Sequence, residues 1–312
     1  MGIIVEVTDL VKRFGDFAAV DGVSFSIAEG EVFGLLGPNG AGKTTTISMI
    51  SCLLSPDGGD VTVRGHSVLK DATAVKRELG VVPQEVALYP TLSAAENLAF
   101  WGRMYGLSGA ALKDAVAGAL ALAGLEDRSK ERVEKYSGGM KRRINIDAGV
   151  LHKPRVLLMD EPTVGIDPQS RNHILETVKE LNKGGMTVLY TSHYMEEVEF
   201  LCDRIAIMDH GKIIAMGTLN ELRDVVGGMD VVAVGVSDVS DAVLEAVRAI
   251  EGVESADRTD ETMEVLTRSS GLILGKLVAV LESEGAHVMS VTVTEPNLES
   301  VFLHLTGKSL RD

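Results

Sequence analysis

The chain has 312 residues, 45% of them hydrophobic, so it can form one large domain with an appendage, or two domains. Its net charge of −15 disfavours sequence-independent binding to nucleic acid and direct attachment to anionic lipid, because both need a basic surface. No run of 18 apolar residues and no signal-peptide pattern is present, which predicts a protein kept in the cytosol.

The N-terminal part is expected to form strands that lead into a glycine-rich loop. Apolar residues in 3–15 and 20–37, punctuated by Gly and Asp, predict three or more strands, the last of them at 31–36. The segment GPNGAGKTT follows with the spacing of a P-loop, in which glycines let backbone N–H groups curl around phosphate oxygens. The residues expected to form this loop are Gly37, Pro38, Asn39, Gly40, Ala41, Gly42, Lys43, Thr44 and Thr45. Lys43 would reach the β- and γ-phosphates and Thr44 would bind Mg²⁺ at the start of a helix.

The middle of the chain changes to a helical pattern. A short helix at 72–79 and a strand at 80–84 precede a mostly helical insert at about 85–153, which is rich in Ala and Leu at helical spacing. Near its end, YSGGM begins a helix in which Ser137, Gly138 and Gly139 would offer a hydroxyl and N–H groups to phosphate. Seen alone, such a helix start is more often only an N-cap.

Two strands that end in polar side chains complete the candidate site. VLLMDE ends on Asp160, which can hold Mg²⁺, and on Glu161, which can orient and deprotonate a water molecule. After a helix at 170–185, MTVLYTSH ends on His193. Each of these side chains could be structural if considered alone, and their order after a P-loop favours a nucleotidase. A hairpin with its turn at His210-Gly211 is expected next.

The Gly227-Gly228 pair is expected to divide the chain into domains at 1–226 and 227–312. Patterns beyond it predict strand, helix, strand, strand, helix and strand at 230–236, 240–250, 253–258, 263–268, 271–284 and 287–294. This βαββαβ order is typical of a ferredoxin-like unit, and a last helix is expected in NLESVFLHLTG.

Taken in order, these motifs resemble those of the ATP-binding subunits of ABC transporters, over about residues 3–218. GPNGAGKTT is similar to Walker A, VVPQ to the Q-loop, YSGGM to the LSGGQ signature, VLLMDE to Walker B, VGID to the D-loop and TSH to the switch region. The resemblance implies an α/β fold: a P-loop NTPase core with an antiparallel β subdomain and the helical insert, followed by the small ferredoxin-like α+β domain. It also implies ATP and Mg²⁺ as cofactors.

The resemblance further assigns roles to single residues. It implies that Gln84 contacts Mg²⁺ and the attacking water, that Asp167 crosses to the opposing protomer, that His193 contacts the γ-phosphate and that Phe14 stacks on adenine. Tyr136 and Met140 replace the usual Leu and Gln of the signature. The phosphate-contacting residues of the signature remain, so activity is expected to be retained.

The C-terminal segment EPNLESVFLHLTGKS resembles the ending of ABC-2-type exporter ATPases, the daunorubicin-resistance-like group. This implies a homodimeric ATPase that drives a separate ABC-2-type transmembrane permease and reaches the inner face of the cell membrane through it. Two alternatives are a soluble ABC ATPase acting on the ribosome or nucleic acid, and a sensor that binds nucleotide without hydrolysis. The single cassette and the acidic C-terminal part disfavour the first, and Glu161 with His193 disfavours the second. The transported substrate is not readable from the chain.

Overall fold

The computed structural model describes residues 2–225, 229–237, 240–259, 262–294 and 297–306. The chain forms two compact units that meet in sequence between Gly217 and Thr218. Helix α8 (Leu219–Val225) therefore groups with the second unit, where it contacts α11 (Leu298–Thr306). The Gly227-Gly228 boundary expected from the sequence lies outside the described residues.

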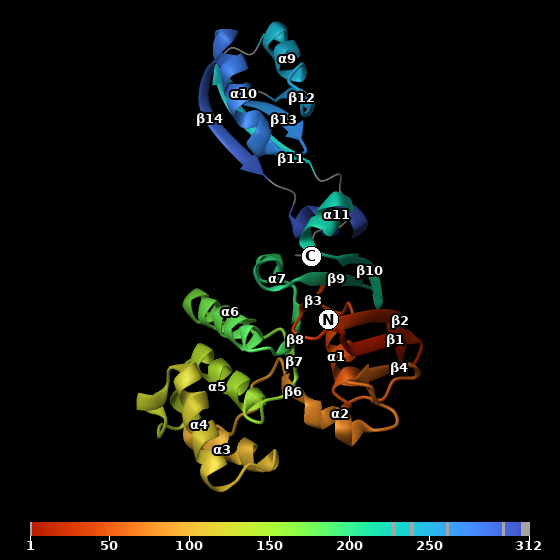
Figure 1. Cartoon of the computed structure of the whole chain (residues 1–312), viewed down its shortest axis with the longest axis vertical. Coiled ribbons are helices and arrows are strands. Elements are labelled where there is room, and N and C mark those ends of the chain that lie inside the picture. The colour runs from red at the N-terminus through yellow and green to blue at the C-terminus, as the bar shows by residue number, and fades with distance from the viewer. Residues whose placement is uncertain (1, 226–228, 238–239, 260–261, 295–296, 307–312) are drawn as a thin grey trace. The chain divides into compact units, whose positions relative to one another are not determined.

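A six-stranded sheet forms the centre of the first unit (Figure 1). Its strand order is β10 (Lys212–Gly217), β9 (Arg204–Asp209), β3 (Val32–Leu36), β8 (Thr187–Ser192), β7 (Val156–Asp160) and β6 (Leu79–Val82). All neighbours are parallel except the hairpin of β9 and β10, whose turn lies at His210 and Gly211 as expected. Strands β3, β7 and β8 are buried along their whole length, because helices or a second sheet cover both faces. Their carboxyl ends therefore meet at one edge.

A smaller antiparallel sheet covers one face of this centre. It consists of β2 (Phe17–Ala28), β1 (Ile3–Phe14), β4 (Gly58–Val63) and β5 (His66–Ser67), in that order. Its inward-facing apolar residues share one core with α1 (Lys43–Ile50) and β3. The stacked rings of Phe25 and Phe33, with centroids 5.1 Å apart, join the two sheets directly.

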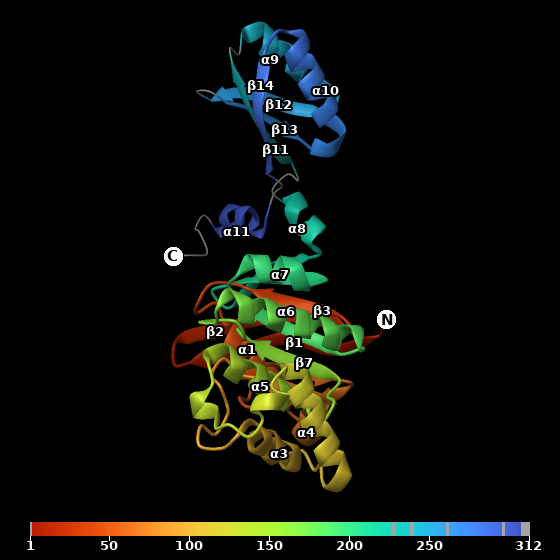
Figure 2. The ribbon, with the colours of Figure 1, turned by 90° about the vertical axis from the view of Figure 1, so that its left-hand side faces the viewer.

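Helices cover the opposite face and form the insert (Figure 2). Helices α6 (Pro168–Lys183) and α7 (Met195–Leu201) share a second core with β7 and β8. The insert packs α3 (Ala94–Met104), α4 (Gly109–Ala123) and α5 (Gly138–Val150) around a core of their own, and the short α2 (Ala72–Glu78) precedes it. Within the described parts of the chain, no helix combines the length and the hydrophobicity that crossing a membrane requires.

The second unit contains the βαββαβ order expected from the sequence (Figures 1 and 2). Its elements are β11 (Asp230–Ser237), α9 (Asp241–Arg248), β12 (Val253–Thr259), β13 (Thr262–Thr267), α10 (Ser270–Ser283) and β14 (His287–Thr294). The strands pair antiparallel in the order β12, β13, β11, β14, and both helices share one core with the sheet. This is the topology of a ferredoxin-like unit.

Close packing of β6 on the end of α5 yields a stability test. A Cβ added at Gly80 would lie 2.4 Å from the carbonyl oxygen of Gly149 and 2.8 Å from Cγ of Pro154, so the backbone would have to move. Gly80→Ala should lower the free energy of unfolding by about 1–3 kcal/mol, measured by urea denaturation. Gly118→Ala is the matched control, because Gly118 lies in α4 with nothing within 4 Å of its added Cβ. That change should stabilise by about 0.5–1 kcal/mol, and equal effects of the two substitutions would contradict this account.

Candidate active site

The P-loop connects β3 to α1, and its glycines are required by their surroundings. Gly40 and Gly42 have backbone φ angles of 81° and 107°, which residues with a Cβ atom rarely adopt. A Cβ at Gly37 would lie 2.3 Å from the carbonyl oxygen of Met208, and one at Gly42 would lie 2.4 Å from that of Ala19. The loop thus brings backbone N–H groups and the start of α1 together without intervening side chains, the geometry that binds phosphate.

Lys43 supplies a positive charge inside this loop. Its side chain is 4% exposed, and Nζ donates to the carbonyl oxygens of Gly37 at 2.7 Å and Pro38 at 3.0 Å. It also forms an ion pair with Oε1 of Glu161 at 3.0 Å. The flexible lysine stem is therefore held at the centre of the candidate site.

A pocket of about 330 Å³ opens in front of the loop. Its lining residues are Phe14, Phe17, Ala19, Asn39, Gly40, Gly42, Lys43, Thr44, Thr45, Gln84 and Glu161. Phe14 and Phe17 face each other across the β1–β2 turn and remain 53% and 62% exposed, so their rings offer a surface for a flat base. Phe17 is a site residue that the sequence motifs did not identify. Its position opposite Phe14 across a two-residue turn is the signal that could have found it.

Glu161 is the residue on which the predicted catalytic groups converge. His193 Nδ1 lies 3.4 Å from its Oε1, and Gln84 Nε2 donates to its Oε2 at 3.3 Å. Its own N–H donates to Thr191 Oγ1 at 3.0 Å, which supports a left-handed φ of 44°. Burial acts to raise the pKa of Glu161, but the hydrogen bond and charge of Lys43, with a smaller contribution from His193, outweigh it, so the pKa is lowered. Glu161 is therefore held as a carboxylate.

Asp160 lies beside this centre, at the end of β7. It is 3% exposed, and its Oδ1 accepts a hydrogen bond from Thr191 Oγ1 at 2.7 Å. The Thr191 hydroxyl thus contacts both residues: it donates to the carboxylate of Asp160 and accepts from the backbone N–H of Glu161. Thr191 is the first residue of the TSH motif, but the sequence analysis assigned it no role.

The signature and D-loop residues gather at a different place. Ser137 caps α5 by accepting from Met140 N at 3.3 Å, and Asp167 caps α6 by accepting from Ser170 N at 2.9 Å, a hydrogen bond that lowers the pKa of Asp167. The two helix starts touch, since a Cβ at Gly139 would lie 2.0 Å from Ser170 Oγ. Ser137 and Gly138 are exposed, and none of these residues lines the P-loop pocket. The structure therefore brings together only part of the predicted site.

The two departures from the usual signature are explained by burial. Tyr136 and Met140 are only 4% and 8% exposed, and both side chains belong to the core of the helical insert. Tyr136 Oη donates to the carbonyl oxygen of Arg128 at 2.7 Å, and the Arg128 guanidinium lies over its ring. These side chains face the insert, so their identity does not alter the exposed helix start.

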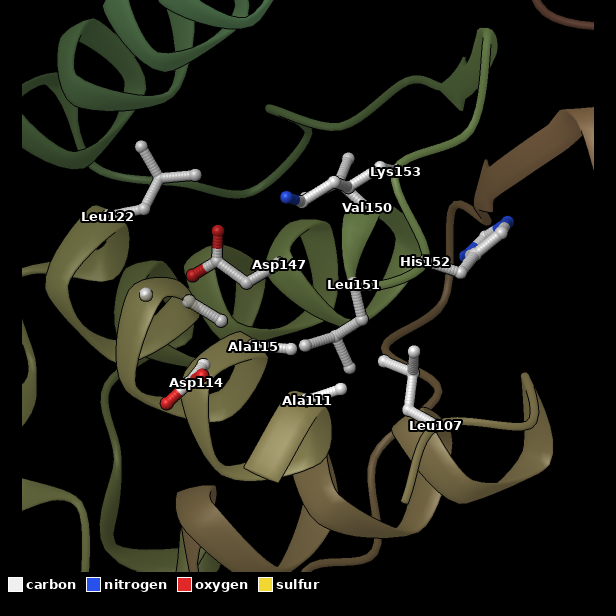
Figure 3. A pocket seen from close by; sticks show the side chains of 12 residues that line it. Leu107, Ala111, Asp114, Ala115, Leu122, Asp147, Val150, Leu151, His152 and Lys153 are labelled. Carbon is white, nitrogen blue, oxygen red and sulfur yellow. The ribbon is translucent and has the colours of Figure 1, made fainter. Parts of the chain in front are cut away.

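A second, larger pocket of about 610 Å³ lies between α4, α5 and residues 151–153 (Figure 3). Its walls are mostly Ala, Leu and Val, with Asp147 on α5 and Asp114 on α4. Burial raises the pKa of Asp147 well above its usual range, which favours the neutral acid. No residue of the P-loop lines this pocket. Size alone is thus a poor guide, and the smaller pocket is the candidate for nucleotide binding.

A mainly parallel sheet with a P-loop after β3 and two carboxylates after β7 defines a P-loop nucleotidase. A family model described as "ABC transporter" matches residues 20–164. The linearmycin resistance ATP-binding protein LnrL of Bacillus subtilis (strain 168) is 53% identical over 99% of this chain and 100% of that protein. The daunorubicin resistance ATP-binding protein DrrA3 of Streptomyces coeruleorubidus is 39% identical over 96% of this chain and 95% of that protein.

Solved structures agree. A dimeric ATP-binding cassette in a post-hydrolysis state with ADP and Pi superposes with a TM-score of 0.63 and 27% identity, covering 69% of this chain and 98% of that one. The chain belongs to the ATP-binding proteins of ABC transporters, in the daunorubicin-resistance-like group, and it is an ATPase. Subunits of this family dimerise and work with a transmembrane permease. The findings support the transporter interpretation and not the ribosome or nucleic-acid alternative.

The Lys43–Glu161 pair predicts a pH effect. In Lys43→Met the opposing charge is lost while burial remains, so the pKa of Glu161 should rise from below to above its usual value. The lowered pKa stabilises the wild-type fold at neutral pH, and this stabilisation is lost as pH falls through that pKa. Carboxyl ¹³C NMR titration without nucleotide measures the change. Lys12→Met, which removes the partner of Asp57 instead, is the control, and an identical Glu161 titration in both variants would contradict the prediction.

Proposed function

We propose that two copies of this chain bind head to tail around ATP and that ATP hydrolysis drives export through an ABC-2-type permease. The division of the site supports this proposal most strongly. The P-loop, Phe14, Gln84, Glu161 and His193 gather at one place, whereas Ser137 and Gly138 lie exposed at another. A second copy can bring its helix start to the phosphates of the first, so each centre would be completed by both chains.

The residues present fit a nucleoside triphosphate with Mg²⁺. The glycine cradle and Lys43 would hold the phosphates, and Phe14 with Phe17 would stack on the base. Thr44, Gln84 and Asp160 are the proposed protein ligands of Mg²⁺, which would neutralise phosphate charge. Among the described residues no group of three or more His, Cys, Asp or Glu could hold a metal ion. Phosphate oxygens and water would supply further ligands, as is usual for Mg²⁺.

Glu161 and His193 are the proposed catalytic residues. Phosphate oxygens bound near Lys43 would compete with Glu161 for the lysine charge. This competition would free the carboxylate to accept hydrogen bonds from a water molecule and, as a general base, to take its proton. His193, 3.4 Å from the same carboxylate, can donate a hydrogen bond to the phosphoryl oxygen.

The names of the relatives support the proposed direction of transport. The relatives at 53% and 39% identity are named for resistance, and a transporter confers resistance when it lowers the concentration of a compound in the cell. We therefore propose export, with this chain on the cytoplasmic side of the cell membrane, where ATP is available. Val86 and Tyr89, 38% and 46% exposed beside Gln84, are the proposed contact with the permease. The net charge of −15 disfavours nucleic acid as a partner.

Glu161→Gln tests the catalytic assignment. The amide cannot act as a base, so steady-state ATP turnover should fall by at least about 10²-fold. ATP binding should persist, and an ATP-bound dimer should accumulate in size-exclusion chromatography with light scattering. Glu29→Gln, at an exposed site, should leave turnover unchanged. Near-normal hydrolysis by Glu161→Gln would refute the role of Glu161.

Ser137→Arg tests the shared site. The long side chain would occupy the exposed helix start that the partner's nucleotide must reach, so the ATP-induced dimer should be lost. Binding of a fluorescent ATP analogue to the monomer should remain within about twofold, because Ser137 does not line the P-loop pocket. The control is Ser108→Arg at the exposed start of α4, where no cap hydrogen bond is present. Undiminished ATP-induced dimerisation of Ser137→Arg would contradict the model of two shared sites.

A further inference from the structure

A buried carboxylate behind the catalytic groups is not explained by the nucleotide site. Glu197, on α7, is 2% exposed. Its single oxygen Oε2 accepts hydrogen bonds from three hydroxyl groups: Thr163 Oγ1 at 2.8 Å, Tyr190 Oη at 2.8 Å and Ser192 Oγ at 3.1 Å. Burying a charge is costly unless donors surround it, so this cluster has a definite arrangement to maintain.

The Ser192 hydroxyl passes this arrangement on to His193. While it donates to Glu197, it accepts a hydrogen bond from the backbone N–H of Tyr194 at 2.9 Å. This bond closes a tight turn with His193 at its centre. The rings of His193 and Tyr194 lie 4.2 Å apart, and the Arg171 guanidinium lies 4.7 Å above the Tyr194 ring. Arg171 Nε is also 3.4 Å from Glu197 Oε1, close enough for charge compensation.

Thr163 connects the same carboxylate to the other catalytic residue. It lies two residues after Glu161, is fully buried, and donates to Glu197 from the loop that leaves β7. The backbone N–H of Val164 donates to the carbonyl oxygen of Glu161 at 3.3 Å and so closes that loop. One carboxylate oxygen therefore fixes the segments on both sides of the 3.4 Å contact between Glu161 and His193.

We propose that Glu197 is a positioning residue that sets His193 against Glu161 through the hydroxyl groups of Ser192 and Thr163. The proposal rests on the proposed roles of Glu161 and His193. Glu197 is not among the residues that line the nucleotide pocket. Its effect is expected on the rate of the chemical step, because a small displacement of a catalytic group lowers the rate strongly.

Glu197→Gln is the main test, with ATPase kinetics and NMR of ring-labelled histidine in the full chain. The amide supplies a neutral acceptor, so kcat should fall between about fivefold and 10²-fold while KM for ATP stays within about twofold. The His193 ring signals, assigned by their loss in His193→Ala, should move, and those of the other histidines should stay. Ser192→Ala, which removes only the linking hydroxyl, should give the same pattern with a smaller loss and covers the case that Glu197→Gln does not fold.

Thr187→Val is the matched control. Thr187 is fully buried and lies on β8, as Ser192 does, but its hydroxyl accepts a hydrogen bond from the backbone N–H of Gly30 and is not linked to Glu197. It should leave the His193 signals and kcat unchanged. Unmoved His193 signals in Glu197→Gln and Ser192→Ala, a shift of all histidine signals, or a KM that rises with the loss of kcat would overturn the proposal. His193→Ala separates the two hypotheses. Near-normal hydrolysis by that variant would refute the proposed catalytic role of His193, whereas the His193 signals in Glu197→Gln and Ser192→Ala still decide the positioning role.

Discussion

The buried ion pair between Lys43 and Glu161 is the interaction on which the site depends. Both side chains are about 95% buried, and their charged atoms lie 3.0 Å apart. Removing one partner would leave an uncompensated buried charge, at a cost of about 3–5 kcal/mol, yet such a pair adds little over apolar packing. Its presence is better explained by chemistry. In the proposed function one charge binds phosphate and the opposite charge binds a water molecule, and Lys43 lowers the pKa of Glu161, which holds that side chain as a carboxylate.

This pair can form only because the backbone brings the two residues to one edge. Strands β3 and β7 flank β8 in parallel, so the P-loop after β3 and the carboxylates after β7 begin at the same level. The helix α7 must also pack closely against β3. A Cβ at Gly34 would lie 2.9 Å from both Val198 Cγ1 and Cys202 Sγ, which shows how tightly α7 sits on β3. That packing also places Glu197 behind the catalytic edge. The strained backbone of Glu161, with φ of 44°, persists because Thr191 over-determines its position.

Much of this arrangement could be predicted from sequence, for a definite reason. Motifs such as GPNGAGKTT and VLLMDE are continuous in the chain, and each lies where a buried strand ends, so periodicity and turn chemistry locate them together. The βαββαβ order of the second unit was predictable in the same way, because each element has its own apolar period. Thr191 and Glu197 act through partners 31 and 34 residues away, and only the folded chain shows those pairs. The grouping of α8 with α11 is likewise a tertiary fact, since neither helix carries a signal for the other.

The signature segment shows why a motif can vary in one part and not in another. Helix α5 has its first residues at the surface and its next turn in the core of the insert. Tyr136 and Met140 face that core, where volume and a hydrogen bond to Arg128 decide what fits. Ser137 and Gly138 face outward, where only a hydroxyl, N–H groups and the absence of bulk matter. Gly139 packs directly against Ser170 of α6, so the start of α5 is held against α6. The segment is thus anchored to the insert and to α6 at once. In the proposed head-to-tail dimer, this rigid connection would let the nucleotide of the partner chain act on both elements through one contact.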